Sequence, residues 1–431
     1  MDTDEHLGSA PPKAYIIAGM LYRYRVLALL FLLSIITYLD RVCISVAGTR
    51  MQKDLSLTPE MWGWVVGAFT ISYAAFEIPS GAMADRIGPR QVLTRIVVWW
   101  SIFTTLTGAV SGFAMLIVTR FLFGAGEAGA YPTSSSAISK WFPVQERAKA
   151  HGIVWMASRI GGAVAPLLVV PIQIAYGWRA SFYVFGILGV IWAIVWYMWY
   201  RDHPSQMAGV TKEEMAVIGA PSSPVAHVGL PWAEALKKKN FLLILWMYHT
   251  YCWGSYFYLS WLHTYLQKGR GFDEQEMKLY SVLPFVAGAC GNLFGGWLSD
   301  KLVDKFGLRI GRRTVGAAGL ALSGVFLMST ALTGDKHLAV LFLTLGYGSM
   351  DCMLPVSWAV CLDIGRKYSG TVTGSMNMAG QLGSFLSSVA FGYMVTYFGN
   401  YNQPLIPLAS MLFVSAFLFS RIDPTELLIA E

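Results

Sequence analysis

The chain has 431 residues, of which 55% are hydrophobic and only 13% are charged, and its mean hydropathy is positive. That charged fraction is about half the ~25% typical of a soluble domain. The composition therefore excludes an ordinary soluble enzyme and indicates a protein with several membrane spans. The net charge of +7 comes from basic residues spread over short loops, so it does not indicate nucleic-acid binding.

A helix needs ~20 apolar residues to cross a bilayer. The chain contains twelve apolar segments of about this length, which are candidate spans. They lie near 24–47, 61–83, 91–112, 115–137, 148–173, 180–199, 241–265, 276–299, 313–333, 337–363, 371–396 and 403–420. The only long polar connection separates the sixth span from the seventh and ends in three lysines. We therefore expect five parts: a tail at 1–23, a six-helix bundle at 24–200, a linker at 201–240, a second bundle at 241–421 and a tail at 422–431.

Basic residues fall mainly on one side of this predicted topology. Arg86, Arg90, the triplet Lys237-Lys238-Lys239 and the pair Arg312-Arg313 lie in loops on the same side as both termini. Because basic loops stay in the cytoplasm, we expect both termini to be cytoplasmic. The opposite loops are too short for long glycosylated segments, which favours a multi-pass protein of a bacterial inner (plasma) membrane.

Four ionisable side chains lie inside two otherwise apolar spans, Asp40 and Arg41 in the first and Arg120 and Glu127 in the fourth. A charge in the bilayer interior costs several kcal/mol, so such residues mark functional sites. Arg120, Glu127 and Tyr131 share one helix face, and we expect Arg120 to neutralise one carboxylate in the empty protein. Facing a shared interior, the four charges could bind an organic anion and couple its movement to protons. The alternative is an ion-pair lattice that only holds the two spans together.

A short element with glycine, aspartate and a basic residue occurs twice, at Gly81 and again 215 residues later at Gly296. Such a repeat indicates a parallel duplication, with the substrate site expected at the midplane between the halves. The first copy resembles the signature loop of the major facilitator superfamily at Gly81, Asp85, Arg86, Gly88 and Arg90. The resemblance implies an all-α membrane protein with twelve transmembrane helices in two pseudo-symmetric six-helix halves, the major facilitator fold.

Further segments are similar to the anion:cation symporter family: Tyr38-Leu39-Asp40-Arg41, Arg120-Phe121, Glu127-Ala128, Tyr131-Pro132 and Lys140-Trp141-Phe142-Pro143. That family includes bacterial sugar-acid transporters, phthalate permeases, sialin and the vesicular glutamate transporters. The resemblance implies transport of an organic anion with protons as the coupling ion. It assigns Asp40 and Glu127, with Arg120 beside them, to proton coupling, and it makes Arg41 the anchor for a substrate carboxylate.

Resemblance to the galactonate carrier of that family maps further substrate contacts onto Tyr38, Tyr73, Ser357, Trp358 and Asn377. Tyrosine and asparagine suit a polyhydroxy acid, because each hydroxyl removed from water needs a hydrogen-bond partner. An alternative stays open for two of these residues. Trp358 could be a core aromatic residue without a substrate contact, and Asn377 could be a tie between helices.

The fifth predicted span departs from the sugar-acid carriers, because Arg159 stands where the galactonate and glucarate carriers have glutamine. We expect Arg159 either to bind a second acidic or hydrogen-bond-accepting group of the substrate or to pair with Glu77 or Asp351. These two acids and His249 are secondary candidates for the site. His249 either joins proton transfer or is a hydrogen-bonded structural residue.

Together these residues predict a proton-coupled symporter that imports an organic anion, with a sugar acid such as a hexonate, hexuronate or aldarate as the first choice. An aromatic or dicarboxylic acid carrier and a transporter-like sensor are the alternatives. A drug exporter would have acids without the arginines, and no metal-ligand cluster or activated nucleophile indicates an enzyme. We expect a monomer that needs no cofactor or metal and whose partners are the anion, protons and the lipid bilayer.

Overall fold

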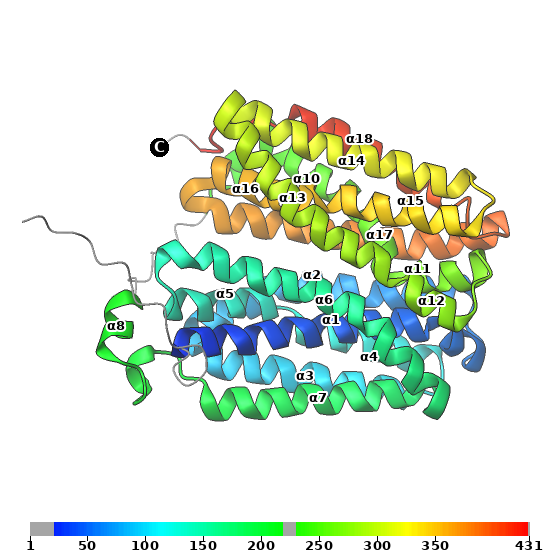
Figure 1. Cartoon of the computed structure of the whole chain (residues 1–431), viewed down its shortest axis with the longest axis horizontal. Coiled ribbons are helices and arrows are strands. Elements are labelled where there is room, and N and C mark those ends of the chain that lie inside the picture. Colours follow the sequence, from blue (N-terminus) through cyan, green and yellow to red (C-terminus); the bar gives the residue numbers. More distant parts are fainter. Residues whose placement is uncertain (1–20, 219–229, 430–431) are drawn as a thin grey trace, which may run out of the picture.

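The computed structural model describes residues 21–218 and 230–429, which form helices and no strand. Figure 1 shows two bundles stacked on each other, with the N-terminal half in blue to green below and the C-terminal half in green to red above. The prediction of an all-helical membrane protein in two halves is therefore confirmed.

The N-terminal half has six rods: α1 (Tyr22–Asp54), α2 (Pro59–Ile87), α3 (Pro89–Gly108), α4 with α5 (Phe113–Glu127 and Ala130–Trp141), α6 (Val144–Tyr176) and α7 (Trp178–Trp199). The fourth rod breaks directly after Glu127, where Gly129 has a φ of 90°. Glycine adopts this left-handed region without steric strain. The break therefore places Glu127 at a helix end in the middle of the bundle.

The C-terminal half has six further rods: α10 (Lys239–Ser260), α12 with α13 (Glu274–Tyr280 and Val282–Phe306), α14 (Leu308–Leu332), α15 with α16 (Lys336–Asp351 and Met353–Gly365), α17 (Ser369–Phe398) and α18 (Leu405–Arg421). Short turns complete the fold: η1 (Pro204–Gln206), α8 (Lys212–Ile218), α9 (Trp232–Ala235), α11 (Leu262–Thr264), η2 (Tyr265–Gly269) and η3 (Arg366–Tyr368). Within the described part of the chain, seven rods are long and apolar enough to cross a membrane, and α18 falls short with 17 residues.

Gly88, between α2 and α3, shows why the predicted signature loop contains a glycine at this position. Its φ is 99°, and a Cβ atom there would lie 2.6 Å from the carboxylate of Asp202. Asp202 accepts a hydrogen bond from the backbone of Arg90, whose side chain donates to the Tyr197 carbonyl oxygen at 2.7 and 2.9 Å. The loop therefore ties the start of α3 to the end of α7. The surroundings of Gly81 and the side chain of Asp85 lie outside what the structure describes.

The two ends of the molecule differ in what they contain. We call the end where α1 begins at Tyr22 and α7 ends at Trp199 the linker end, and α8 and the C-terminus lie there (Figure 1). The opposite end is where α1 ends at Asp54 and α6 ends at Tyr176. These two names are used below for the two faces of the bundle.

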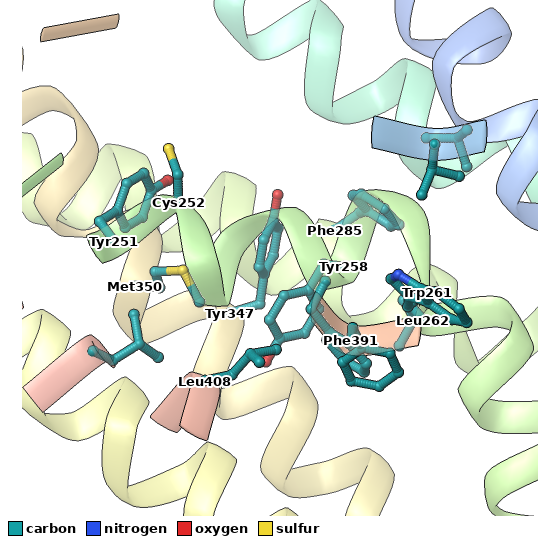
Figure 2. Packing of buried hydrophobic residues seen from close by; sticks show 14 of the residues in the cluster. Tyr251, Cys252, Tyr258, Trp261, Leu262, Phe285, Tyr347, Met350, Phe391 and Leu408 are labelled. Atoms are coloured by element: carbon teal, nitrogen blue, oxygen red, sulfur yellow. The ribbon is translucent and has the colours of Figure 1, made fainter. Parts of the chain in front are cut away.

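Aromatic side chains pack the C-terminal half around α10. Tyr258 packs on Tyr347 of α15 with ring centroids 4.4 Å apart, and Trp261 packs on Phe391 of α17 at 4.8 Å. Figure 2 shows the hydroxyl groups of Tyr258 and Tyr347 pointing in opposite directions. That of Tyr258 donates to the Leu343 carbonyl oxygen at 3.1 Å, so the Tyr347 hydroxyl is left for another partner.

The two halves are joined by polar contacts at the opposite end. Arg50 of α1 donates to both carboxylate oxygens of Glu274 of α12, at 2.9 and 2.6 Å. Gln173 of α6 also donates to Glu274, and Lys268 donates to Gln52 at 2.9 Å. We call these five residues the opposite-end lock, because each contact links the N-terminal half to the C-terminal half.

Candidate functional site

Arg41 and Glu127 form the first ion pair of the site. The Nε of Arg41 donates to Oε1 of Glu127 at 2.5 Å, and both side chains are buried. The guanidinium also lies 4.9 to 5.3 Å from the ring centroids of Tyr38, Phe69 and Tyr73. Among the described residues, neither Oε2 of Glu127 nor Nη2 of Arg41 has a hydrogen-bond partner. The pair thus keeps unused hydrogen-bonding capacity in a buried aromatic surrounding.

Asp40 is buried beside this pair and has no ion pair of its own. Its side chain is 2% exposed, and neither carboxylate oxygen has a hydrogen-bond partner in the part of the chain that the structure describes. Its charged neighbours are Glu127 and Arg120, and Trp100 and Thr104 of α3 lie alongside. In an ion-pair lattice every buried charge would have a partner, so Asp40 argues against the purely structural alternative.

Arg120 forms no ion pair with Glu127 among the described contacts, and the expectation that it neutralises one carboxylate stays a prediction. Its guanidinium lies 4.4 Å from the ring centroid of Phe123 and 5.4 Å from that of Phe69, and no described acid forms an ion pair with it. The physical reason is distance along the helix. Seven residues of α4 separate Arg120 from Glu127, a rise of roughly 10 Å, whereas α1 brings Arg41 directly to the carboxylate.

Arg159 forms a second ion pair, with Asp351. Its Nη2 donates to Oδ1 at 3.1 Å, its Nε lies 3.0 Å from Oδ2, and its Nη1 donates to the Tyr347 hydroxyl at 2.8 Å. Tyr347 precedes Asp351 by one turn of α15, so both face the same side. Of the two expected acid partners, Asp351 is therefore the one that binds Arg159. The pair also links α6 of one half to α15 of the other.

Glu77 pairs instead with Asn377. The Asn377 side-chain amide lies 2.6 and 2.8 Å from the two carboxylate oxygens of Glu77, which joins α2 to α17. In this structure Asn377 is thus a tie between helices of different halves, the alternative left open by the sequence. Both side chains are partly exposed.

Three aromatic side chains form a layer on the linker side of the two arginines. Tyr131 stacks on Trp155 with ring centroids 4.5 Å apart, and Trp155 meets Trp358 edge-on at 5.5 Å. We call Tyr131, Trp155 and Trp358 the aromatic layer. Trp358 thus contacts the other half, and it also packs against the buried hydrophobic cluster. Sequence reasoning missed Trp155, although it lies four residues before Arg159 and so shares its helix face.

Other predicted site residues are placed as follows. Tyr38 and Tyr73 are buried against Arg41, at 7% and 2% exposure. Ser357 is buried and donates to the Leu354 carbonyl oxygen of its own helix at 2.8 Å. His249 lies 3.0 Å from the Ala379 carbonyl oxygen through Nδ1, as its structural alternative describes.

His263 is a buried titratable residue that sequence reasoning did not single out. Its Nδ1 lies 2.9 Å from the Ser45 hydroxyl of α1, and its Nε2 has no partner among the residues described. The contact adds a further link between the halves, toward the opposite end. Nothing in the local sequence pattern distinguishes this histidine, because the partner lies 218 residues away. In the described chain, no group of three or more His, Cys, Asp or Glu side chains could hold a metal ion.

Comparison with known proteins identifies the family. Residues 30–388 match the family model of the Major Facilitator Superfamily, so the chain belongs to that superfamily. A bacterial homolog of the human lysosomal transporter Spinster, in an inward-facing and unoccupied conformation, has the same fold. Its TM-score is 0.77 at 20% sequence identity, over 94% of this chain and 97% of that one. The fold expected from the signature loop is therefore confirmed.

Three relatives are similar over most of their length. A probable sulfoacetate transporter of Cupriavidus necator is 36% identical over 93% of this chain and 94% of its own. The hexuronate transporter of Bacillus subtilis is 30% identical over 88% and 89%, and the probable galactarate/D-glucarate transporter of Escherichia coli 30% over 89% of each. These relatives are transporters and not enzymes, and they confirm the resemblance to sugar-acid carriers.

Proposed function

We propose that this chain is a proton-coupled symporter that imports a small organic acid anion by alternating access. The observation that carries the proposal is the buried Arg41–Glu127 pair with the unpartnered carboxyl of Asp40 beside it. Arg41 holds Glu127 through Nε alone, and its Nη2 has no partner among the described residues. Its guanidinium fork therefore suits an incoming carboxylate, which it can bind through two N–H groups. The relatives named above support an organic acid as the cargo.

The coupling follows from the need to avoid bare charges in a buried site. When a substrate carboxylate takes the place of Glu127 on Arg41, the displaced Glu127 would remain as an unpaired buried anion. A proton on Glu127 removes that charge, so substrate and proton bind together. Asp40, next to Glu127, offers the neighbouring site for a proton on its way through the N-terminal half. The halves then rock around the site, and the opposite-end lock and the aromatic layer alternate as barriers.

The relatives support a small organic acid as the cargo. Sulfoacetate, hexuronates and aldarates, which the relatives are named for, all contain a carboxylate for Arg41. We place the protein in an inner membrane with both termini in the cytoplasm, so an inward proton gradient drives uptake. The linker end is then the cytoplasmic end.

Uptake into proteoliposomes tests the proposal. The purified protein is reconstituted, and counterflow and pH-driven uptake of sulfoacetate, glucuronate, glucarate, galactonate and phthalate are measured, with ethidium as a cationic control. We expect counterflow of at least one acid, accumulation only with an acidic exterior, and none of ethidium. Glu127→Gln should retain exchange but lose accumulation.

Two outcomes would contradict the proposal. If no acid gives counterflow or thermal stabilisation, the arginine site does not bind organic anions. If an acid accumulates equally well after a protonophore collapses the gradient, protons are not the coupling ion. Binding without any transport would instead support a sensor.

A further inference from the structure

We infer that Arg159, Asp351 and Tyr347 form a second anion subsite, so that the transporter selects substrates with two acidic groups over those with one. This inference rests on the proposed function, because it needs Arg41 to hold the first carboxylate. It narrows the substrate class to short dianions such as sulfocarboxylates and aldarates, at the expense of hexuronates and hexonates.

The second ion pair repeats the design of the first. Arg41 is paired with Glu127 and lies against tyrosine rings, and Arg159 is paired with Asp351 and binds the Tyr347 hydroxyl. Each arginine is buried, and each is paired with a carboxylate. Asp351 in the second subsite therefore corresponds to Glu127 in the first, and each is the carboxylate that a substrate anion would replace on its arginine.

The two subsites share neighbouring side chains. Tyr38 of α1 lies against Arg41, with 5.3 Å from guanidinium to ring centroid, and it is also among the groups that face Arg159. On the linker side, Tyr131 faces Arg41 while Trp155 lies one turn from Arg159, and these two rings stack on each other. The inference therefore requires one small molecule to reach both guanidinium groups past these shared neighbours.

The position of the second pair makes a permanent structural role unfavourable. Arg159 belongs to α6 and Asp351 to α15, so the pair spans halves that move relative to each other during alternating access. Breaking it without replacement would leave two buried unpaired charges, which is strongly unfavourable. A second anionic group of the substrate replaces the carboxylate on Arg159, and a proton on Asp351 removes the charge left behind.

The Arg159–Asp351 pair is surrounded mainly by tyrosine hydroxyl groups. The groups that face Arg159 or Asp351 from the packed helices are Tyr38 of α1, Tyr251 and Tyr258 of α10, Tyr347 of α15, and Cys352. Apart from Arg159, no charged side chain among the described residues lies beside Asp351. Tyrosine hydroxyls donate hydrogen bonds, so they suit the oxygens of a sulfonate or carboxylate.

The charge balance follows directly. A dianion enters with one proton on Glu127 and one on Asp351, so the loaded carrier has the same net charge as the empty one. A monoanion needs a proton on Glu127 alone and leaves the second ion pair intact. The number of protons bound should therefore be two for a dianion and one for a monoanion.

Matched pairs of ligands test the inference on the full-length protein in nanodiscs. Calorimetry compares sulfoacetate with methylsulfonylacetate, its sulfone analogue with a single negative charge, and glucarate with gluconate. We expect the dianion of the preferred pair to bind about tenfold tighter or more, and Arg159→Gln to remove that preference while monoanion affinity changes less than about threefold. Asp351→Asn should keep dianion binding and lower the protons taken up per dianion from two to one. Arg179→Gln, in an ion pair within one half, is the matched control and should change neither quantity.

The outcomes separate the inference from the proposed function. If wild-type protein binds monoanions with no preference for dianions, the second subsite is refuted and the proposed function stands. If Arg159→Gln weakens both classes equally, or if the double replacement Arg159→Gln with Asp351→Asn restores uptake with an unchanged substrate ranking, the pair is structural. If no acid binds the wild type, the proposed function itself fails. Should Arg159→Gln not fold, the wild-type ligand pairs and the proton count of Asp351→Asn decide the matter.

Discussion

Replacing Glu274 by glutamine should shift the transporter toward a state that is open at the opposite end. Glu274 is the centre of the opposite-end lock, where it accepts hydrogen bonds from Arg50 at 2.9 and 2.6 Å and another from Gln173. Nη1 of Arg50 in turn donates to the Gln173 carbonyl oxygen at 3.0 Å. Glutamine keeps the shape of the side chain but removes the charge that holds the guanidinium fork.

The size of the effect follows from the exposure of the pair. The side chains of Arg50 and Glu274 are 38% and 20% exposed, so the pair lies between the two extremes for which energies are known. Fully exposed pairs contribute about 0.2–1 kcal/mol, and removing one partner of a fully buried pair costs about 3–5 kcal/mol. We expect about 1–2 kcal/mol here, which is a factor of roughly 5–30 in the ratio of closed to open molecules.

Distances between spin labels measure this ratio. Labels at Tyr176 and Leu332, which are 81% and 73% exposed, mark the ends of α6 and α14 on different halves. In a background without the native cysteines, Glu274→Gln should move population toward the longer distance. Asp54→Asn is the matched control, because Asp54 pairs with Arg179 at 2.5 Å in the same half. It should leave the distribution unchanged.

The reasoning would be wrong if Glu274→Gln left the distance distribution unchanged, because the lock would then contribute nothing to closure. It would also be wrong if Asp54→Asn produced the same shift. In that case the effect would come from the net charge of this face and not from a link between halves.

Three further predictions concern the site and the packing. Arg41→Lys keeps the charge but loses the planar fork that can bind a substrate carboxylate through two N–H groups, so substrate affinity measured by calorimetry should fall about tenfold or more; an affinity near wild type would remove Arg41 from the site. Asp40→Asn mimics a permanently protonated carboxyl, so pH-driven accumulation should be lost while counterflow persists, and pH-dependent accumulation in this variant would contradict its role. Gly291→Leu should lower the melting temperature by several degrees, because its Cβ would overlap the Gly348 carbonyl oxygen and overpacking costs about 1–3 kcal/mol; an unchanged melting temperature would show that α13 and α15 can separate freely.

The sequence by itself determined the class of the protein and the inventory of its site. Apolar length gives the spans, because the bilayer excludes unpaired backbone and charge. For the same reason, Asp40, Arg41, Glu127 and Arg159 stand out, since an ionisable side chain among apolar neighbours has to face a protein interior. These inferences need only local composition and helical periodicity. The family was indicated by the resemblance of short motifs, and the comparisons confirm it.

Only the tertiary structure decided which of these groups meet. Arg41 and Glu127 are 86 residues apart, Arg159 and Asp351 are 192 apart, and Asn377 and Glu77 are 300 apart. Helical periodicity fixes the face on which a side chain lies, but not the helix that packs against that face or the height at which it does so. The sequence therefore left Arg159 with two possible acids and did not identify Arg41 as the partner of Glu127. The partner of each buried charge depends on how the two halves are rotated against each other, and that rotation is the motion by which a carrier of this fold works.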